Sequence, residues 1–379
     1  MSFLKKIKIF IKSNYPILTN FLIRMRDNNK FIKMFKRSFF ISLTKNIHGK
    51  KIIKSERGFL FDFSIDNFVS YVFRPKNSVD LKSNIENYNN NSTAIIIQGS
   101  IKDLEKFVEE TLLIYKKLFK DNLIILSTWE KDIKNEFLVK FNNDKNIKII
   151  INTKPITNFN VDLQTYSTNS ALLYAEEKKI KYCLKTRTDC RIYKKNSIFF
   201  LKNLLKNYPI NKDYQFLGDR IISCSTDTRK YRVYGLSDIF LFGTTSNLKN
   251  YFNKNSFKKS LAEMNFGNHP CIKNETAVIN EIFLCARYLQ KNNIEVKWTL
   301  DDWWAKCREI FLIVDSSALD FFWYKYEWKY EQRFNINYTT NFEQSIQHSD
   351  WLNLYTDNKF FFNKNLKEKW KIQDGVFVQ

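Results

Sequence analysis

Short apolar runs alternate with longer amphipathic segments between residues 93 and 184. The apolar runs cover residues 93–97, 123–126, 147–151 and 182–184. In the segments 104–119 and 163–178, apolar residues recur every three or four positions, as they do on one face of a helix. The order strand, helix, strand, strand, helix, strand predicts an α/β fold with a Rossmann-like, mostly parallel sheet flanked by helices.

The alternation is less regular after residue 194. We expect further helices and strands, the helices at 197–205 and 276–290 and the strands at 220–223, 237–242 and 311–314. The last fifty residues are polar and aromatic without clear periodicity, so we expect a tail that packs on the domain. The chain is thus divided into a basic N-terminal region (1–85), an α/β domain (86–330) and a C-terminal tail (331–379).

The composition excludes several classes of protein. With 379 residues, 44% of them hydrophobic, and only 8 Gly and 5 Pro, the chain can form a sizeable core and is neither fibrous nor of low complexity. No apolar run reaches the roughly 18 residues of a transmembrane helix, and we recognise no signal peptide. The 6 Cys include no CxxC pair, which predicts free thiols in a reduced cytoplasmic protein.

Positive charge is concentrated near the N-terminus. The formal net charge is +23, and residues 1–54 hold 14 Lys or Arg against a single acid, Asp27, so that 14 − 1 = +13 lies in this segment. Phe3, Ile7 and Phe10 share one helical face among lysines. This pattern is typical of a helix that binds an anionic membrane surface. A basic helix that packs on the α/β domain would have the same pattern.

Small and polar residues follow the predicted strands at their carboxyl ends. The first strand ends in Gln98-Gly99-Ser100 and the second in Ser127-Thr128-Trp129, while Gln164 lies near the start of a helix. The carboxyl ends of parallel strands meet at one edge of a sheet, where open α/β sheets bind their ligands. We therefore expect these groups to line a binding site.

The segment 180–192, IKYCLKTRTDCRI, brings most of the charge to this edge. A buried-strand pattern runs into three cations and one acid: Lys185, Arg187, Arg191 and Asp189. One carboxylate among cations suggests a site for an anionic ligand, with or without a metal ion between acid and phosphate. A surface salt-bridge cluster at a strand end would give the same pattern.

Taken in order, these strand ends resemble the WavE-type lipopolysaccharide-synthesis family, a group of bacterial proteins regarded as glycosyltransferases. The resemblance covers residues 93–327. The motifs that carry it are IIIQGSI (95–101), IILSTW (124–129), Gln164 with Ser167-Thr168, YCLKTRTDCRI (182–192), SDIFLFG (237–243) and Lys325-Tyr326. Two positions depart from the family's pattern: Ser100 stands where Pro is common, and Cys190 where Gln is common.

The resemblance implies a GT-A-like mixed sheet that binds a nucleotide-sugar donor. The matching donor-binding positions are Gln98, Gly99, Ser100, Thr128 and Gln164. The residues themselves agree with this. A glycine after a strand lets the backbone approach a nucleotide closely. The cations at 185, 187 and 191 suit a pyrophosphate, because a guanidinium pairs with phosphate oxygens through two hydrogen bonds.

Asp189 occupies the place of the metal-binding acidic motif of many GT-A enzymes. That motif usually has acids at positions i and i+2, but here the second position is Arg191. One carboxylate can hold Mg²⁺ or Mn²⁺ if phosphates and water complete the coordination. Arg191 could instead neutralise the leaving pyrophosphate directly. We expect a divalent cation at Asp189, because an uncompensated carboxylate would repel the pyrophosphate.

Glycosyl transfer requires a base that deprotonates the acceptor hydroxyl. Asp238, near the predicted strand 237–242, is our candidate. It could equally cap a turn or hold Arg232, and Glu275 and Glu281 compete for the role. Asp301-Asp302 before Trp303-Trp304 could line an acceptor pocket, although buried tryptophans are the more ordinary interpretation. His269 has no neighbouring ligand spacing and is expected to be structural.

The sequence therefore predicts a cytoplasmic glycosyltransferase, peripheral at the inner membrane. It would transfer a sugar from a nucleotide-sugar to a lipid-linked or lipopolysaccharide-type glycan, and no nucleic-acid partner is expected. One alternative is a non-catalytic module of the same fold that binds a nucleotide or glycan. Another is a sugar nucleotidyltransferase, which the single Gly and the lack of Arg in residues 98–106 disfavour.

Overall fold

The structure is a computed structural model, and the segments that it describes are 53–54, 60–61, 74–80, 92–253 without Asn142, Asn158 and Tyr231, 280–324, 345–357, 371–373 and 376–378. The chain divides into two units, Met1–Phe73 and Arg74–Gln379. In the first unit, β1 (Ile53–Lys54) pairs with β2 (Leu60–Phe61) antiparallel. The amphipathic segments expected within residues 1–54 lie outside the described residues, apart from β1.

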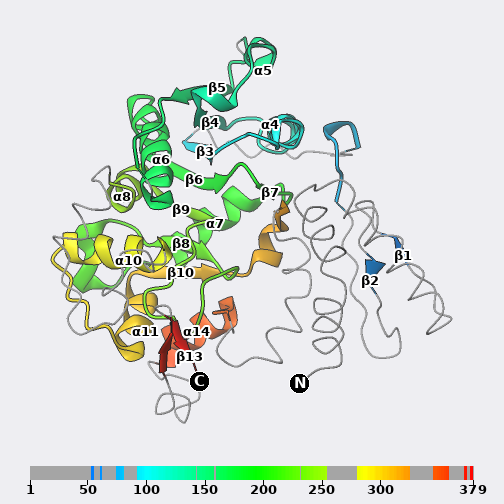
Figure 1. Cartoon of the computed structure of the whole chain (residues 1–379). Helices are drawn as coiled ribbons and strands as arrows, with labels where there is room; N and C mark the ends of the chain where they lie inside the picture. Colours follow the sequence, from blue (N-terminus) through cyan, green and yellow to red (C-terminus); the bar gives the residue numbers. More distant parts are fainter. Residues whose placement is uncertain are drawn as a thin grey trace, which may run out of the picture. The chain divides into compact units, whose positions relative to one another are not determined.

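The second unit contains a seven-stranded sheet of order β10-β8-β9-β6-β3-β4-β5. Its strands are β3 (Thr93–Gln98), β4 (Leu123–Trp129), β5 (Ile147–Asn152), β6 (Tyr182–Arg187), β8 (Ile221–Cys224), β9 (Leu241–Thr244) and β10 (Phe311–Val314). Only β9 is antiparallel to its sheet neighbours. The prediction of a mixed, mostly parallel sheet is confirmed (Figure 1).

Helices flank this sheet and follow the periodicity of the sequence. The described α-helices of the second unit are α4 (Glu105–Leu118), α5 (Asn135–Phe141), α6 (Asn160–Glu177), α7 (Ser197–Asn207), α8 (Thr245–Tyr251), α10 (Asn280–Lys291), α11 (Leu300–Glu309) and α14 (His348–Asp357). Helices α6, α8 and α10 pack together, and α6 lies against β3, β4, β5 and β6. Helices α11 and α14 pack on each other and on β10.

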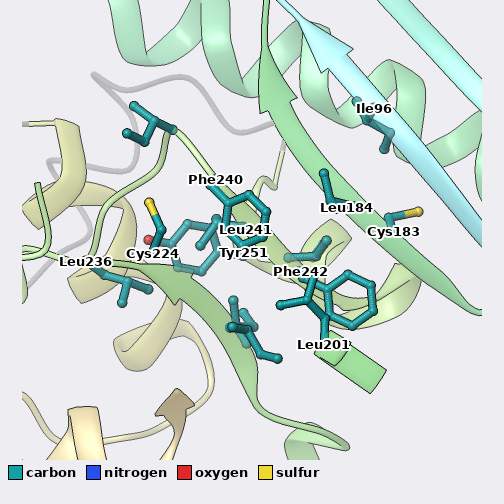
Figure 2. Close-up of a cluster of buried hydrophobic side chains, with 14 of the residues drawn as sticks. Ile96, Cys183, Leu184, Leu201, Cys224, Leu236, Phe240, Leu241, Phe242 and Tyr251 are labelled. Carbon is teal, nitrogen blue, oxygen red and sulfur yellow. The ribbon is translucent and has the colours of Figure 1, made fainter. Parts of the chain in front are cut away.

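The core is continuous around β6, β8 and β9. Figure 2 shows Leu184 of β6 and Phe242 of β9 among the other apolar side chains of this cluster. Both residues are fully buried, and they face each other in the antiparallel register. Strands buried on both faces are continuously apolar rather than alternating, which is why short runs such as 182–184 identify them.

The strand order reverses beside β3, and this reversal places the site. The chain runs outward through β3, β4 and β5, then returns to the other side of β3 as β6. Gln98 and Arg187, the last residues of β3 and β6, are register partners. Open α/β sheets bind ligands at such a switch point, beyond the carboxyl ends of the strands.

Two differences from the prediction in the second half concern the site. The strand expected at 237–242 begins only at Leu241, so Asp238 lies in the loop before β9, where the Ser237 carbonyl accepts a bond from Ser223 Oγ at 2.8 Å. In addition, β7 (Cys190–Ile192) pairs antiparallel with β11 (Phe321–Trp323). None of the described helices has the length and apolar composition that a membrane-spanning segment requires.

Candidate active site

Arg187 and Asp189 form a two-point ion pair at the carboxyl end of β6. Nε of Arg187 donates to Oδ1 of Asp189 at 3.0 Å, and Nη2 donates to Oδ2 at 3.1 Å. The indole Nε1 of Trp323 donates to the same Oδ2 at 2.9 Å. The Arg187 guanidinium lies 5.5 Å from the centre of the Trp323 ring. We call these three residues the Arg187 cluster.

Arg187 is the most exposed member of the cluster. The Asp189 side chain is 8% exposed, whereas that of Arg187 is 31% exposed. Both bonds of Arg187 to Asp189 use Nε and Nη2, and Nη1 donates to none of the residues in the described segments. A guanidinium that is held through two of its nitrogens, while the third has no bond to a described residue, is suited to bind an oxyanion.

Gly99 and Thr188 join the ends of β3 and β6. Gly99 has φ of 127°, and a Cβ at this position would lie 2.9 Å from Thr188 Oγ1. Thr188 N donates to the Gln98 carbonyl at 3.0 Å, and its Oγ1 donates to the Ser100 carbonyl at 2.8 Å. The positive φ and the close approach both require glycine. The bonds hold the 98–100 turn directly beside the Arg187 cluster.

The side chain of Gln98 is fixed from α6. Ser167 Oγ donates to Gln98 Oε1 at 2.9 Å, and Ser127 Oγ donates to the Ser167 carbonyl at 2.7 Å. Near this contact, Thr128 Oγ1 and Gln164 Nε2 are buried without a hydrogen-bond partner among the described residues. Buried polar atoms are rarely left unpaired, because each costs free energy. These two atoms are therefore candidates for ligand contact.

Lys185 is fully buried in the middle of the sheet rather than at its edge. Its Nζ donates to the Asp238 carbonyl and lies 5.2 Å from the centre of the Phe252 ring. Burial lowers the pKa of Lys185 from 10.5 to about 8, an effect that the Asp238 carboxylate opposes. The structure thus places Lys185 behind the site, where it holds the loop that carries Asp238.

Arg191 points away from the Arg187 cluster. It is 1% exposed. Its Nε donates to Thr111 Oγ1 at 2.7 Å and its Nη2 to the Phe107 carbonyl at 2.7 Å, both on α4. Nη1 donates to the Lys76 carbonyl and to Tyr193 Oη, each at 3.1 Å. A guanidinium with these bonds has no edge left for a pyrophosphate, so we assign Arg191 to the packing of β7 on α4.

Asp238 lies in a buried environment with a second carboxyl group. It is 2% exposed. The pKa of Glu281, on α10, is raised from 4.5 to about 8, mainly by burial and also by the Asp238 and Asp227 carboxylates. Arg232 pairs with Asp227 at 3.5 Å. Two carboxyl groups in a low-dielectric site tend to share one negative charge, which allows one of them to act as a base.

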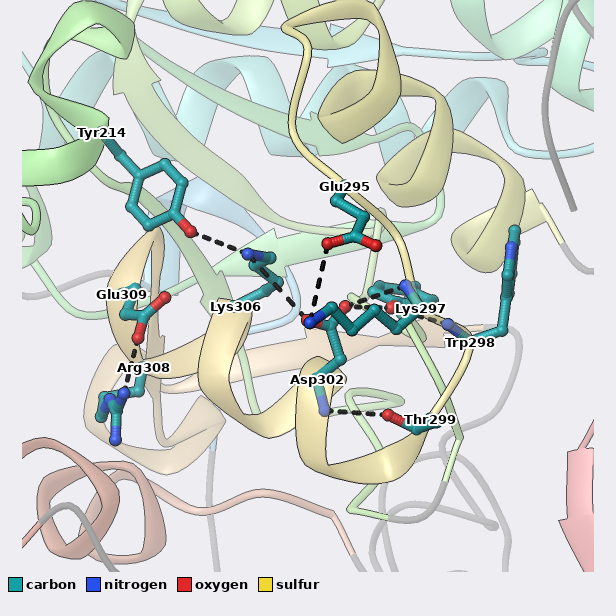
Figure 3. Close-up of polar contacts among 10 residues, drawn as sticks. Tyr214, Glu295, Lys297, Trp298, Thr299, Asp302, Lys306, Arg308 and Glu309 are labelled. Atoms are coloured by element: carbon teal, nitrogen blue, oxygen red, sulfur yellow. Dashed lines mark hydrogen bonds and ion pairs between the residues drawn. The ribbon is translucent and has the colours of Figure 1, made fainter. Parts of the chain in front are cut away.

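Asp302 belongs to a structural network on α11 (Figure 3). Its Oδ2 accepts bonds from Tyr234 Oη and, at 3.2 Å, from Lys297 N, while its own N–H donates to the Thr299 side chain at 3.2 Å. Trp303 and Trp304 are buried in the core. The ordinary interpretation of this segment is therefore confirmed for the tryptophans. Glu275, His269 and Lys325-Tyr326 lie outside the described residues.

A divalent cation does not fit the arrangement around Asp189. Both carboxylate oxygens accept charge-assisted bonds from Arg187, and Oδ2 also accepts from Trp323. Among the described residues, no group of three His, Cys, Asp or Glu side chains could hold a metal ion. Divalent cations bind carboxylate oxygens with free lone pairs. Here both oxygens of the Asp189 carboxylate accept hydrogen bonds from the Arg187 guanidinium instead.

The family model for WavE lipopolysaccharide synthesis matches residues 93–371. This range contains the whole seven-stranded sheet and every site residue described above. The chain belongs to the WavE lipopolysaccharide synthesis family. No curated protein matches this WavE chain.

Solved structures also resemble this WavE protein. One of them is 4-diphosphocytidyl-2C-methyl-D-erythritol synthase from Anaerococcus prevotii DSM 20548. It has 14% sequence identity and a TM-score of 0.33, and the match covers 61% of this chain and 90% of the synthase. A likeness of this extent carries no information on activity.

Several site residues of the WavE chain were not predicted from its sequence. Trp323 reaches Asp189 across 134 positions of the chain, through the β7–β11 pairing that no sequence pattern indicated. The Gln98 contact with Ser167 had a weak signal, since Ser167 lies one helical turn after Gln164. Thr188 was visible only as part of the KTRTD motif. Its bonds to Gln98 and Ser100 depend on the parallel register of β3 and β6.

Proposed function

We propose that this WavE protein is a glycosyltransferase with a GT-A-like fold that uses a nucleotide-sugar donor. The acceptor is a lipopolysaccharide-type or lipid-linked glycan, in keeping with the family. One observation carries the proposal. At the switch point of the sheet, the close-approach turn at Gly99 lies beside an accessible, fixed guanidinium, Arg187. That combination suits a nucleotide joined to a phosphate group.

Each part of the site has a role in this proposal. Arg187 binds the phosphates of the donor, and Gly99 allows the backbone to approach the nucleoside. Thr128 and Gln164 supply the unpaired polar atoms that would contact it. Gln98, held by Ser167, and Ser100 complete the donor side. The proposed residues come from β3, β4, α6 and β6, as expected for a ligand across a switch point.

Asp238 is the proposed base, with Glu281 as its partner. The acceptor hydroxyl loses its proton to the ionised carboxylate as its oxygen attacks the anomeric carbon, and the nucleotide leaves with its phosphates. Burial and the neighbouring Asp238 and Asp227 carboxylates raise the pKa of Glu281 to about 8, so that Glu281 is mostly protonated near neutral pH. Lys185 fixes the Asp238 backbone.

The N-terminal segment 1–54 would bring the protein to the acceptor. Its charge of +13 is suited to the anionic inner membrane, where a lipid-linked glycan would be found. This part of the proposal rests on the sequence, and it makes the protein a peripheral one on the cytoplasmic side.

Donor hydrolysis by the purified full-length protein tests the function. UDP-, GDP- and CMP-sugars are incubated without acceptor, and the released nucleotide is measured. We expect slow turnover of one donor, reduced about 100-fold in Asp238→Asn. Asp302→Asn is the control, since the Asp302 carboxylate accepts bonds from Tyr234 and Lys297 and has no role in the proposed reaction. Binding of a donor without turnover would indicate a binding module. Release of pyrophosphate from a nucleoside triphosphate and a sugar phosphate would indicate a nucleotidyltransferase.

A further inference from the structure

The bonds of Arg187 leave one of its guanidinium nitrogens, Nη1, without a described partner. The guanidinium is held by Asp189 on one edge and lies over Trp323 on a face. These contacts fix the orientation of the whole guanidinium. Its remaining nitrogen, Nη1, has no hydrogen bond to a described residue. Fixing a guanidinium in this way lowers the entropy cost of binding an anion, because its orientation is already determined.

We propose that the Arg187 cluster is the diphosphate subsite of the donor, and that it binds the diphosphate without a divalent cation. This inference rests on the proposed function, because it assigns the phosphate contacts of the same donor. Arg187 supplies the positive charge and the hydrogen-bond donors. Asp189 and Trp323 act as positioning residues, which hold the guanidinium rather than the ligand.

The geometry removes the main reason to expect a metal ion. A bare carboxylate beside a diphosphate would repel it, and a bridging cation would relieve the repulsion. Asp189 is not bare, since Arg187 and Trp323 together donate three hydrogen bonds to it. Cys190 Sγ also donates to Oδ1 at 3.5 Å. To coordinate a cation, Asp189 would have to give up one of these four contacts, because a carboxylate has about four lone-pair sites.

Trp323 makes the arrangement rigid. Its indole N–H fixes Asp189, and its ring lies against the guanidinium. The backbone is fixed as well, because Tyr324 N donates to the Asp189 carbonyl at 2.8 Å. The pairing of β7 with β11 thus sets the position of the carboxylate, the ring and, through them, the guanidinium.

Calorimetric titration of the full-length protein tests the inference. UDP, GDP and CDP are titrated in EDTA and again with Mn²⁺. UMP, GMP and CMP, which lack the second phosphate, are titrated for comparison. We expect one diphosphate to bind with the same Kd, within about threefold, under both conditions. Binding that appears only with Mn²⁺ would overturn the inference and leave the proposed function intact. Binding of CMP without binding of any diphosphate would likewise overturn the inference and leave the proposed function intact. Failure of every nucleotide and every donor sugar would overturn both.

Variants identify the residues through the ratio of diphosphate to monophosphate affinity. Arg187→Lys should lower this ratio at least tenfold in EDTA, because lysine lacks the planar fork. Trp323→Phe keeps an aromatic ring but removes the indole N–H, so we expect the affinity ratio to fall by a smaller, several-fold amount. Asp189→Asn should weaken diphosphate binding to the same degree with and without Mn²⁺. A loss confined to the Mn²⁺ titration would make Asp189 a metal ligand and refute the subsite.

Arg191→Lys is the matched control, because it changes the same residue type four positions away. The bonds of Arg191 go to α4, Lys76 and Tyr193. We expect a less stable protein whose folded fraction keeps the wild-type affinity ratio. A purely structural role for Arg187 predicts that both variants weaken monophosphate and diphosphate binding equally, and that outcome would also overturn the inference.

Discussion

Gly99 carries the tightest backbone constraint of the site. Its φ of 127° is strained for any residue with a Cβ, and the added carbon would lie 2.9 Å from Thr188 Oγ1. The Thr188 side chain could move only by giving up its bond to the Ser100 carbonyl. The 98–100 turn and the Arg187 cluster are therefore mechanically linked through one hydroxyl.

Gly99→Ala should destabilise the protein by about 2 kcal/mol or more, and it should weaken nucleotide binding. The positive φ accounts for about 1 kcal/mol, and the displaced Thr188 accounts for the rest. Urea unfolding measures the loss. Gly218→Ala is the control, since Gly218 has φ of 86° but a Cβ there would meet nothing within 4 Å. Equal losses in the two variants would show that the contact with Thr188 carries no free energy.

Lys185 links stability to pH. Burial lowers its pKa from 10.5 to about 8 in the folded protein. Between these values the unfolded chain binds more protons than the folded chain, so the Lys185 contribution to stability rises with pH. Below pH 8 both states are protonated and the burial cost is at its maximum. The Asp238 and Asp189 carboxylates oppose this lowering of the Lys185 pKa, and the Arg187 guanidinium adds to it.

We therefore compare the free energy of unfolding of wild type with that of Lys185→Met. The difference, wild type minus variant, should increase between pH 8 and pH 10. Denaturant unfolding at half-unit steps provides the measurement, and the difference cancels the other titrating groups. A flat difference across this range would show that Lys185 has an ordinary pKa. Donor hydrolysis should also fall in Lys185→Met, because the Asp238 carbonyl loses its donor.

Single residues at strand ends were the most predictable part of the site. Gly99, Arg187 and Asp189 were recognised because the carboxyl ends of parallel strands converge, and a charged residue after an apolar run is conspicuous. Arg191 was misjudged, since the sequence does not show which face of β7 packs on α4. The divalent cation expected at Asp189 stays a prediction that the bonds from Arg187 disfavour, since the sequence does not show whether the partner of a carboxylate is a metal ion or a guanidinium.

At the scale of elements, Arg191 attaches β7 to α4. Its guanidinium lies 3.9 Å from the centre of the Phe107 ring and donates to the Phe107 carbonyl and to Thr111. Ile192 N also donates to Tyr115 Oη at 2.9 Å. These bonds fix β7, and through β7 they fix β11 with Trp323. The helix thus supports the Arg187 cluster through β7.

Arg191→Met should cost about 3 kcal/mol of stability or more. The change leaves buried carbonyl and hydroxyl groups of α4 unpaired and removes a stacked cation. Urea unfolding measures the loss, with Lys206→Met on the exposed surface of α7 as the control, where a change within about 0.5 kcal/mol is expected. A loss as small as that of the control would mean that α4 and β7 pack independently of this arginine.

Elements of the first half of the domain were predictable, and those of the second half were less so. From β3 to β6, each strand is followed by a helix or loop and a further parallel strand, and periodicity locates each of them. Strand β9 is antiparallel and short, and no local pattern distinguishes it from the loop that precedes it. Pairing of β7 with β11 joins segments far apart in the chain, which local propensity cannot encode.

At the scale of the whole molecule, our proposal gives positive charge two functions. Cations of the α/β domain bind the donor or hold the fold, and the basic segment 1–54 binds the membrane. Within the α/β domain, Arg187 and Arg191 are held by hydrogen bonds. The segment 1–54 contains 14 cations against one acid. Net charge of this kind acts at a distance and is screened by salt, whereas the bonds within the domain are not.

The full-length protein should therefore bind vesicles that contain anionic lipid, and it should dissociate as salt is raised. Replacing Lys5, Lys8 and Lys12 by Glu should weaken this binding by about 100-fold or more, because each basic residue near such a surface contributes about 1 kcal/mol. Cosedimentation with vesicles of phosphatidylserine and phosphatidylcholine gives the affinity, with pure phosphatidylcholine as the control. Donor hydrolysis in solution should be unchanged in this variant, since the donor site lies in the α/β domain. Unchanged vesicle binding after the charge reversal would indicate that the basic segment packs on the protein instead.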